Sequence, residues 1–107
     1  MGIFSFLMGN DINKGVEEYK STTGAYLIDV RTREEYREGH IPESKNIPLH
    51  EIGQIGNLVT NKDTPLFVHC LSGGRSGEAV SVLKRMGYTK VKNIGGISAY
   101  TGKVEKS

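Results

Sequence analysis

Cysteine is nearly absent from the sequence, in which Cys70 is the only one among 107 residues. A single cysteine excludes an internal disulfide and argues against a zinc site built from cysteines. Because there is no disulfide framework, a reducing compartment is the simpler interpretation, and we expect a cytoplasmic protein. We expect neither a bound metal nor a cofactor.

An excess of charge of one sign is also missing. The chain has 14 Lys and Arg against 12 Asp and Glu, so its net charge is +2. This balance argues against nucleic acid or an acidic membrane as the main partner. The 5 tyrosines form no stripe with basic residues, which again argues against nucleic acid.

Long hydrophobic runs are missing as well. The apolar start of the chain, residues 1–9, is much shorter than the roughly 20 residues that a membrane-spanning helix needs. No basic segment precedes it and no cleavage site is obvious, so we expect no signal peptide. Gly2 is not expected to carry a myristoyl group, because Phe6 stands where Ser or Thr is required.

Length and composition are those of one folded domain. Hydrophobic residues make up 36% of the chain and charged residues 24%, which argues against a disordered protein. The length lies near the usual size of a domain, so we expect a single domain over residues 1–107.

Strands and helices are expected to alternate along the chain. Residues 25–30 and 66–70 are nearly continuous apolar runs, which is typical of strands buried on both faces of a parallel sheet. Capping residues and apolar residues at helical spacing predict helices between them. The expected helices cover residues 11–21, 32–39, 49–59, 75–87 and 98–103, and further strands lie near 46–47 and 88–94. This order predicts an α/β fold with a parallel sheet.

Local signals add detail to this outline. Thr32 and Glu35 have the spacing of a capping box, and Gly39 is expected to end the helix that they begin. Two glycines weaken the helix that is predicted over residues 49–59. Residues 1–10 are expected to form a short strand or a packing arm.

The segment around Cys70 carries the chemistry. Cys70 follows a buried strand and precedes a helix, at the end of the sheet where ligands bind in open α/β folds. Gly73 and Gly74 allow the loop to turn its amides inward as an anion-binding nest, next to the positive end of the helix. Arg75 adds a permanent charge with a planar fork that suits an oxyanion. Each feature favours a thiolate, so the sequence predicts a nucleophilic Cys70 that faces an anionic substrate.

The segment around Cys70 has other interpretations. A cysteine after an apolar strand is, taken alone, most often a small buried hydrophobic residue. The glycines and the arginine favour the nucleophile instead. Phosphatase-type cysteine loops place their arginine one position further along the chain than Arg75, so the cradle here is smaller and suits one sulfur atom better than a phosphate. Ser76 is a candidate helix cap as well as a donor to bound sulfur.

Two polar residues near this segment are expected to be structural. His69 adjoins Cys70, but neighbouring side chains of a strand point to opposite faces, which argues against a Cys–His pair. Asp29 ends a buried strand, and a buried carboxylate needs a partner. Arg31, Arg33 or backbone amides can supply it.

Three groups of residues together resemble the signatures of one family. The first comprises Asp29-Val30-Arg31, Glu35-Tyr36, Gly39-His40-Ile41-Pro42, Ser44 and Asn46-Ile47-Pro48, the second is Cys70-Leu71-Ser72-Gly73-Gly74-Arg75-Ser76, and the third comprises Gly95-Gly96 and Tyr100. They resemble the first signature, the active-site loop and the closing motif of rhodanese-like sulfurtransferase domains, over residues 26–100. Tyr100 stands where many members have tryptophan.

The resemblance implies a small parallel sheet of about five strands, flanked by helices on both faces. It implies that Cys70 takes a sulfane sulfur from a donor such as thiosulfate, becomes a persulfide, and passes the sulfur to a thiol or to cyanide. The loop amides would surround the persulfide, and Arg75 would help to bind the anionic donor. The loop residues so implicated in substrate binding are Leu71, Ser72, Gly73, Gly74, Arg75 and Ser76.

The missing second cysteine has a mechanistic consequence. A persulfide on Cys70 has no resolving thiol within the chain, so the acceptor is expected to be an external thiol, cyanide or a protein. Two half-reactions predict ping-pong kinetics. A dithiol reductase is disfavoured for the same reason. The alternatives are a sulfur-carrier or protein-interaction module with little activity on free thiosulfate, and a small cysteine phosphatase or arsenate reductase; the oligomeric state stays open.

Overall fold

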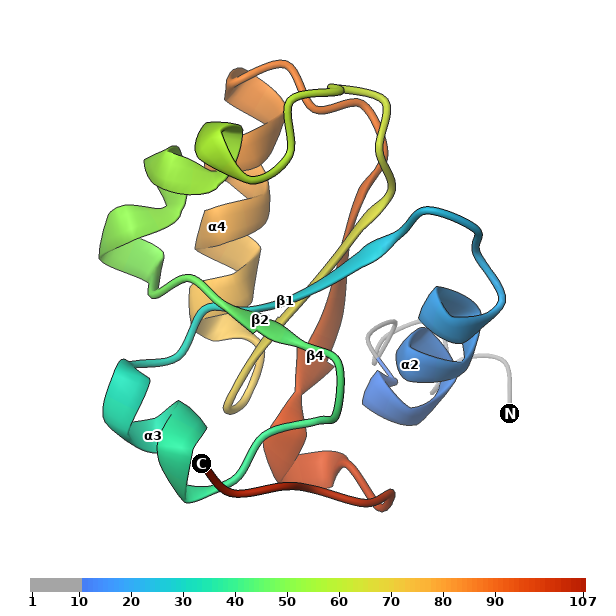
Figure 1. Ribbon diagram of the computed structural model, residues 1–107, viewed down its shortest axis with the longest axis vertical. Coiled ribbons are helices and arrows are strands. Elements are labelled where there is room, and N and C mark those ends of the chain that lie inside the picture. The colour runs from blue at the N-terminus through green and yellow to red at the C-terminus, as the bar shows by residue number, and fades with distance from the viewer. Residues whose placement is uncertain (1–10) are drawn as a thin grey trace.

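Parallel strands form the centre of the structure, which is a computed structural model that describes residues 11–107 (Figure 1). The sheet of this part of the chain has the strand order β2-β1-β3-β4 and is parallel throughout. Its strands are β1 (Tyr26–Asp29), β2 (Lys45–Asn46), β3 (Leu66–Cys70) and β4 (Val91–Gly96). The predicted α/β fold is confirmed, with four strands among residues 11–107 where about five were expected for the chain. The strand or arm predicted for residues 1–10 lies outside the described residues.

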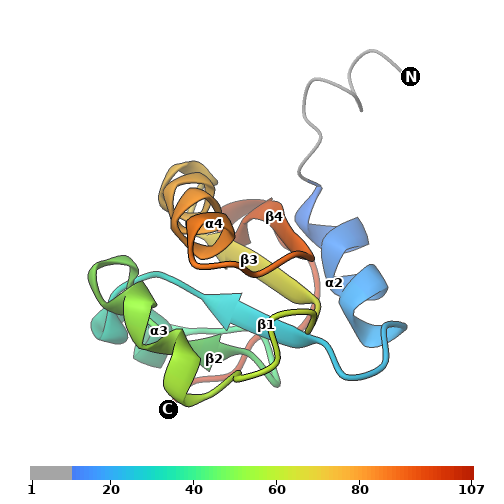
Figure 2. The same cartoon turned by 90° about the horizontal axis from the view of Figure 1, so that it is seen from above.

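Helices cover both faces of the sheet, as predicted. Helix α2 (Ile12–Lys20) packs on one face, while α4 (Gly74–Arg85) and the 3₁₀ helix η1 (Leu49–Asn57) pack on the other (Figures 1 and 2). Helix α3 (Arg33–Glu38) follows β1, and the 3₁₀ turn η2 (Ile97–Ala99) follows β4. Among residues 11–107, no helix is both long and apolar enough to cross a membrane.

The helix starts carry the caps that the sequence predicts. The Asp11 carboxylate accepts the Asn13 amide at 3.0 Å, at the start of α2. Thr32 and Glu35 form the reciprocal capping box of α3, because each side chain accepts the backbone amide of the other. Gly39 follows the last residue of α3, so this short helix has the predicted bounds.

Three elements differ from the prediction. The helix predicted over residues 49–59 is the 3₁₀ helix η1, consistent with the weak α-helical propensity of its two glycines. The strand predicted over residues 88–94 begins later, because the buried Tyr88 completes the end of α4 and its amide donates to the Leu83 carbonyl at 3.1 Å. The helix predicted over residues 98–103 is limited to η2, since the backbone is extended directly after it.

Alternation along the strands divides the core into two clusters. In β3, Leu66, Val68 and Cys70 belong to the cluster under η1 and α4, whereas Phe67 belongs to the cluster under α2. All five residues of β3 are buried, as expected of a central strand. Tyr100 is partly buried and packs against the α2 cluster.

Gly15 brings α2 close to β4. A methyl group at this position would overlap the side chain of Ile94. We therefore expect Gly15→Ala to lower the free energy of unfolding by about 1–3 kcal/mol, because an overpacked contact forces the helix and the strand apart. Gly53→Ala is the matched control, since the space around Gly53 is open. Urea denaturation measures both variants, and equal stabilities would contradict the close packing of α2.

Candidate active site

Cys70 ends β3 and is only 1% exposed. The chain then turns directly into α4, which begins at Gly74, so the thiol lies beside the start of a helix, as predicted. Gly73 makes this turn with a φ of 110°, in the left-handed region that favours glycine. The Gly73 amide donates to Cys70, with 2.9 Å between the nitrogen and Sγ, and the positive φ then turns the chain into α4.

Several hydrogen-bond donors surround the Cys70 sulfur. The amides of Ser72 and Ser76 join that of Gly73, and Ser76 Oγ lies 3.4 Å from Sγ. Burial acts to raise the pKa of the Cys70 thiol, but these hydrogen bonds oppose it and hold the pKa below its usual value. The site therefore favours the thiolate, which is the form that acts as a nucleophile.

Ser76 is buried and occupies the third position of α4. The alternative that it caps the helix is wrong, because the cap position is taken by Gly73. Its hydroxyl instead lies 2.8 Å from Asn93 Oδ1 and 3.1 Å from the Gly73 carbonyl oxygen. Asn93 of β4 was not anticipated from the sequence, although an amide side chain just before Gly95 at the carboxyl end of a strand is a usable signal.

Arg75 is engaged by a carboxylate. Its Nη1 and Nη2 donate to Glu35 Oε1 and Oε2 at 2.8 and 3.0 Å. Hydrogen bonds from Arg75 lower the pKa of Glu35 to about 2, with those from Thr32 adding to the effect and burial opposing it. The ion pair ties the capping box of α3 to the first turn of α4, and an approaching anion meets this pair instead of a lone cation.

The loop that follows Cys70 has one side exposed to solvent and one side packed on β4. Leu71, Ser72 and Gly74 are exposed, while the Leu71 carbonyl accepts the Ser98 amide at 3.0 Å. On the inner side the loop rests on β4, so closely that a methyl group at Gly96 would overlap the Leu71 carbonyl. The structure thus brings all the predicted loop residues together, and the amides of Ser72, Gly73 and Ser76 face the sulfur.

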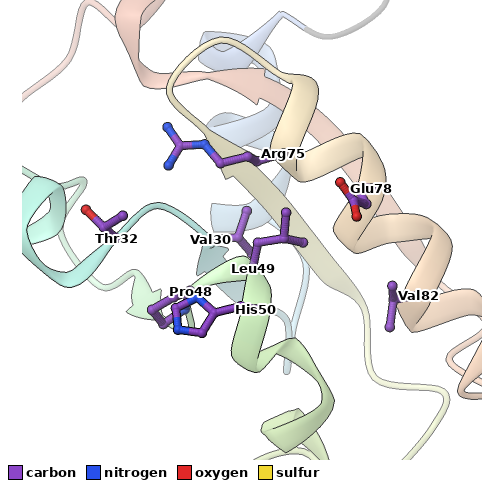
Figure 3. Close-up of a pocket in the computed structure, with 8 residues that line it drawn as sticks. All are labelled: Val30, Thr32, Pro48, Leu49, His50, Arg75, Glu78 and Val82. Carbon is purple, nitrogen blue, oxygen red and sulfur yellow. The ribbon is translucent and has the colours of Figure 1, made fainter.

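A pocket of about 380 Å³ opens beside this loop (Figure 3). Arg75 reaches from α4 toward Thr32 in its wall, while Glu78 and Val82 follow along the same helix. The pocket is lined by Val30, Thr32, Pro48, Leu49, His50, Arg75, Glu78 and Val82. Within residues 11–107, no cluster of three His, Cys, Asp or Glu side chains is placed to hold a metal.

His69 turns toward Asp29. Its Nε2 lies 3.8 Å from Asp29 Oδ2, and both side chains are buried. Burial lowers the pKa of His69. Of the partners predicted for Asp29, Arg31 and a backbone amide are both present: Nε and Nη2 of Arg31 donate to the carboxylate at 3.0 and 2.8 Å, and the Arg31 backbone amide donates to Oδ1 at 2.9 Å. Arg33, the other candidate, pairs with Glu51. The Asp29–Arg31 pair supports the end of β1.

The chain belongs to the rhodanese-like family, whose domain model matches residues 11–103. It is 42% identical over 73 residues to thiosulfate sulfurtransferase PspE of Escherichia coli (strain K12), across 67% of this chain and 70% of that protein. It is 39% identical over 80 residues to putative sulfur carrier protein YrkF of Bacillus subtilis (strain 168), across 74% of this chain and 43% of that protein. A solved structure described as a rhodanese with anions from E. coli has a TM-score of 0.73 and 37% identity, and the match covers 78% of this chain and 99% of that chain. These relatives support rhodanese-type sulfur transfer.

The contact of Gly96 with the loop predicts a local effect on the thiol. We expect Gly96→Ala to lower the free energy of unfolding by about 1–3 kcal/mol and to displace the loop, because the overlap involves backbone atoms. The displaced amides no longer reach the sulfur, so the pH midpoint of Cys70 alkylation rises. Gly56→Ala, in open space, is the control. A Gly96→Ala protein with wild-type stability and alkylation midpoint would contradict the contact.

The Arg75–Glu35 pair predicts a dependence of stability on pH. The pKa of Glu35 is lower in the folded chain than its ordinary value of 4.5, so the pair stabilises the fold above that value, and the stabilisation is lost as the pH falls toward 2. Glu35→Gln retains a capping side chain but removes the charge. We expect the variant to be less stable than wild type by about 1 kcal/mol or less at neutral pH. Denaturation at neutral and at acidic pH measures the difference, which must shrink in acid.

Glu34→Gln is the matched control, since Glu34 lies on the same helix turn and its charge is not part of the pair. A Glu35→Gln difference that persists unchanged in acid would assign the effect to the cap instead of the ion pair.

Proposed function

We propose that this protein is a sulfurtransferase that carries a sulfane sulfur as a persulfide on Cys70, with thiosulfate or another persulfide donor as its substrate. The observation that carries the proposal is the ring of donors around a buried sulfur, formed by the Ser72, Gly73 and Ser76 amides and the Ser76 hydroxyl. Such a ring stabilises a thiolate before the reaction and the negative outer sulfur of a persulfide after it.

The first half-reaction is a displacement at sulfur. The Cys70 thiolate attacks the outer sulfur of thiosulfate, a new S–S bond forms, and the donor's own S–S bond breaks. The electron pair of that bond leaves with sulfite. Arg75 and the loop amides would attract the anionic donor, and the Arg75–Glu35 pair would moderate that attraction.

The second half-reaction returns the enzyme to its starting state. An acceptor thiolate or cyanide attacks the outer sulfur of the persulfide, and the bond between the two sulfurs breaks. Its electron pair remains on Cys70 as a thiolate, while the acceptor leaves as a persulfide or as thiocyanate. Because Cys70 is the only cysteine, the acceptor comes from outside the chain, and ping-pong kinetics follow. We propose a reducing compartment such as the cytoplasm, where a thiol acceptor is abundant.

A sulfur-carrier role is the second candidate. One relative is named a putative sulfur carrier protein, and Cys70 is only 1% exposed, which restricts access to its sulfur. A carrier would accept sulfur on Cys70 and hold it for a partner protein, with little turnover of free thiosulfate. The two roles share the persulfide and differ in the second half-reaction.

Cys70→Ser tests the nucleophile. We expect wild type to gain a mass of about 32 Da on exposure to thiosulfate, lost again on treatment with a reductant, and to form thiocyanate when cyanide is added. The variant should show neither the adduct nor thiocyanate, because a serine hydroxyl stays protonated where the thiol ionises. Intact mass spectrometry and a thiocyanate assay provide the measurements.

The outcomes separate the candidates. Denaturation confirms that Cys70→Ser is folded, and wild type blocked with iodoacetamide is a second negative control. Thiocyanate formation by the folded variant would overturn the proposal. A stable adduct on wild type with negligible turnover would favour the carrier.

A further inference from the structure

Asn93 lies in β4 where the pairing with β3 is irregular. Val68 pairs with Asn93, whereas the next residue, His69, pairs with Gly95, so that Ile94 is the extra residue of a β-bulge. The bulge is stabilised by Asn93 itself, whose Oδ1 accepts the Gly95 amide at 2.9 Å. The side chain is thereby held on the face of β4 that meets α4.

The orientation of the Asn93 amide is fixed at both ends. Oδ1 accepts the Gly95 amide, and Nδ2 donates to the Gly73 carbonyl at 3.2 Å. A half-turn of the amide would place its NH₂ against the Gly95 N–H and its oxygen against the Gly73 carbonyl. The oxygen therefore faces Ser76, and the nitrogen holds the peptide of the cysteine loop.

The Ser76 hydroxyl has one hydrogen and several acceptors. Asn93 Oδ1 lies 2.8 Å from Ser76 Oγ, the Gly73 carbonyl oxygen 3.1 Å, and the Cys70 sulfur 3.4 Å. While Cys70 is a thiol, its S–H donates to Ser76 Oγ, and the hydroxyl donates to Asn93, the nearest acceptor. Once Cys70 is a thiolate, the hydroxyl donates to the sulfur, and the hydrogen bond to Asn93 is given up.

We propose that Asn93 is a positioning residue, which competes with the Cys70 sulfur for the Ser76 hydrogen and, by binding the Gly73 carbonyl, holds in place the residue whose amide donates to that sulfur. Asn93 thus sets the balance between thiol and thiolate. The inference rests on the proposed function for its catalytic meaning. Thiol ionisation is measured without a sulfur donor, however, so failure of this inference is distinguishable from failure of sulfur transfer.

Other titratable groups lie on the elements that pack around Cys70. Arg75 of α4 interacts with the sulfur and is paired with Glu35 of α3. Asp29 of β1 and His69 of β3 are buried, and His69 faces Asp29. The β4 residue opposite Cys70 is a glycine without a titratable side chain. All of these groups are retained when Asn93 is replaced, so a changed ionisation reports on Asn93.

The substitution Asn93→Asp has several effects, and each of them raises the pKa of Cys70. Aspartate keeps the acceptor for Gly95 and Ser76 but holds the Ser76 hydrogen more strongly. It also replaces the donor to Gly73 with an oxygen and adds a negative charge near the sulfur. We expect the midpoint of Cys70 ionisation to rise by about one pH unit or more. The initial rate of alkylation by iodoacetamide across a pH series measures this midpoint.

Asn61→Asp is the matched control. Asn61 Oδ1 accepts the amide two residues later, that of Asp63, at 2.8 Å, in the same arrangement as Asn93 and Gly95. The control adds an equal charge in a turn away from Cys70, and its midpoint should remain that of wild type. An unchanged or lowered midpoint in Asn93→Asp would overturn the proposal, as would an equal rise in both variants.

A second measurement needs no substitution at Asn93. In wild type labelled with ¹⁵N, the side-chain amide resonances of Asn93 should move with pH, with the midpoint found by alkylation. In Cys70→Ser this movement should disappear, because no thiol is left to ionise. Resonances that do not respond to pH in wild type would overturn the proposal, even if Asn93→Asp failed to fold.

Discussion

The hydrogen bond from the Gly73 amide to the Cys70 sulfur constrains the surrounding structure. The amide donates to a sulfur at the buried end of β3, and the left-handed backbone of Gly73 then turns the chain back over the sheet. The same turn starts α4 at once, so the Ser76 amide and hydroxyl also face the sulfur. The turn is so tight that β4 must pass beneath it without a side chain, at Gly96. Three segments of the chain thus share one requirement, the enclosure of a single sulfur atom.

The ion pair of Arg75 with Glu35 explains why two distant motifs accompany each other. These residues are 40 positions apart in the sequence, yet two nitrogens of the guanidinium donate hydrogen bonds to the two oxygens of the carboxylate. Glu35 also caps α3 through Thr32, so one carboxylate serves a helix start and the cysteine loop together. The first signature therefore supports the site without lining the sulfur. It also leaves the positive charge of Arg75 partly compensated.

Much of the fold was predictable because its signals are local. The apolar runs of β1 and β3, the cap at Asp11 and the capping box of α3 each depend on residues close together in the sequence. The cysteine loop was predictable for the same reason, since its glycines and arginine follow Cys70 directly. The start of β4 was not predictable from the sequence. Tyr88 continues the apolar pattern of the strand, but it is buried just after α4, where its amide donates to the Leu83 carbonyl.

The remaining site contacts depend on distances that a linear pattern does not contain. Glu35 was identified as a cap, and nothing in its spacing indicated that Arg75 is its second partner. A role for Asn93 was not predicted, because its contacts with Gly73 and Ser76 arise from the packing of α4 on β4. Conversely, the rule that neighbouring side chains of a strand alternate was enough to separate His69 from Cys70. The geometry of residues close together in the sequence was therefore predictable, whereas the contacts that support the site are defined only by the folded structure.

The β-bulge in β4 bears on how the length of this segment can vary. Within the sheet that residues 11–107 form, β4 pairs with β3 and is the last strand in the order. Here the extra residue, Ile94, lets Asn93 and Gly96 each occupy the position that the cysteine loop requires. Deleting one residue would restore regular pairing but would shift either the amide or the glycine out of place. Insertions and deletions should therefore be rarer between Asn93 and Gly96 than in the surface turns.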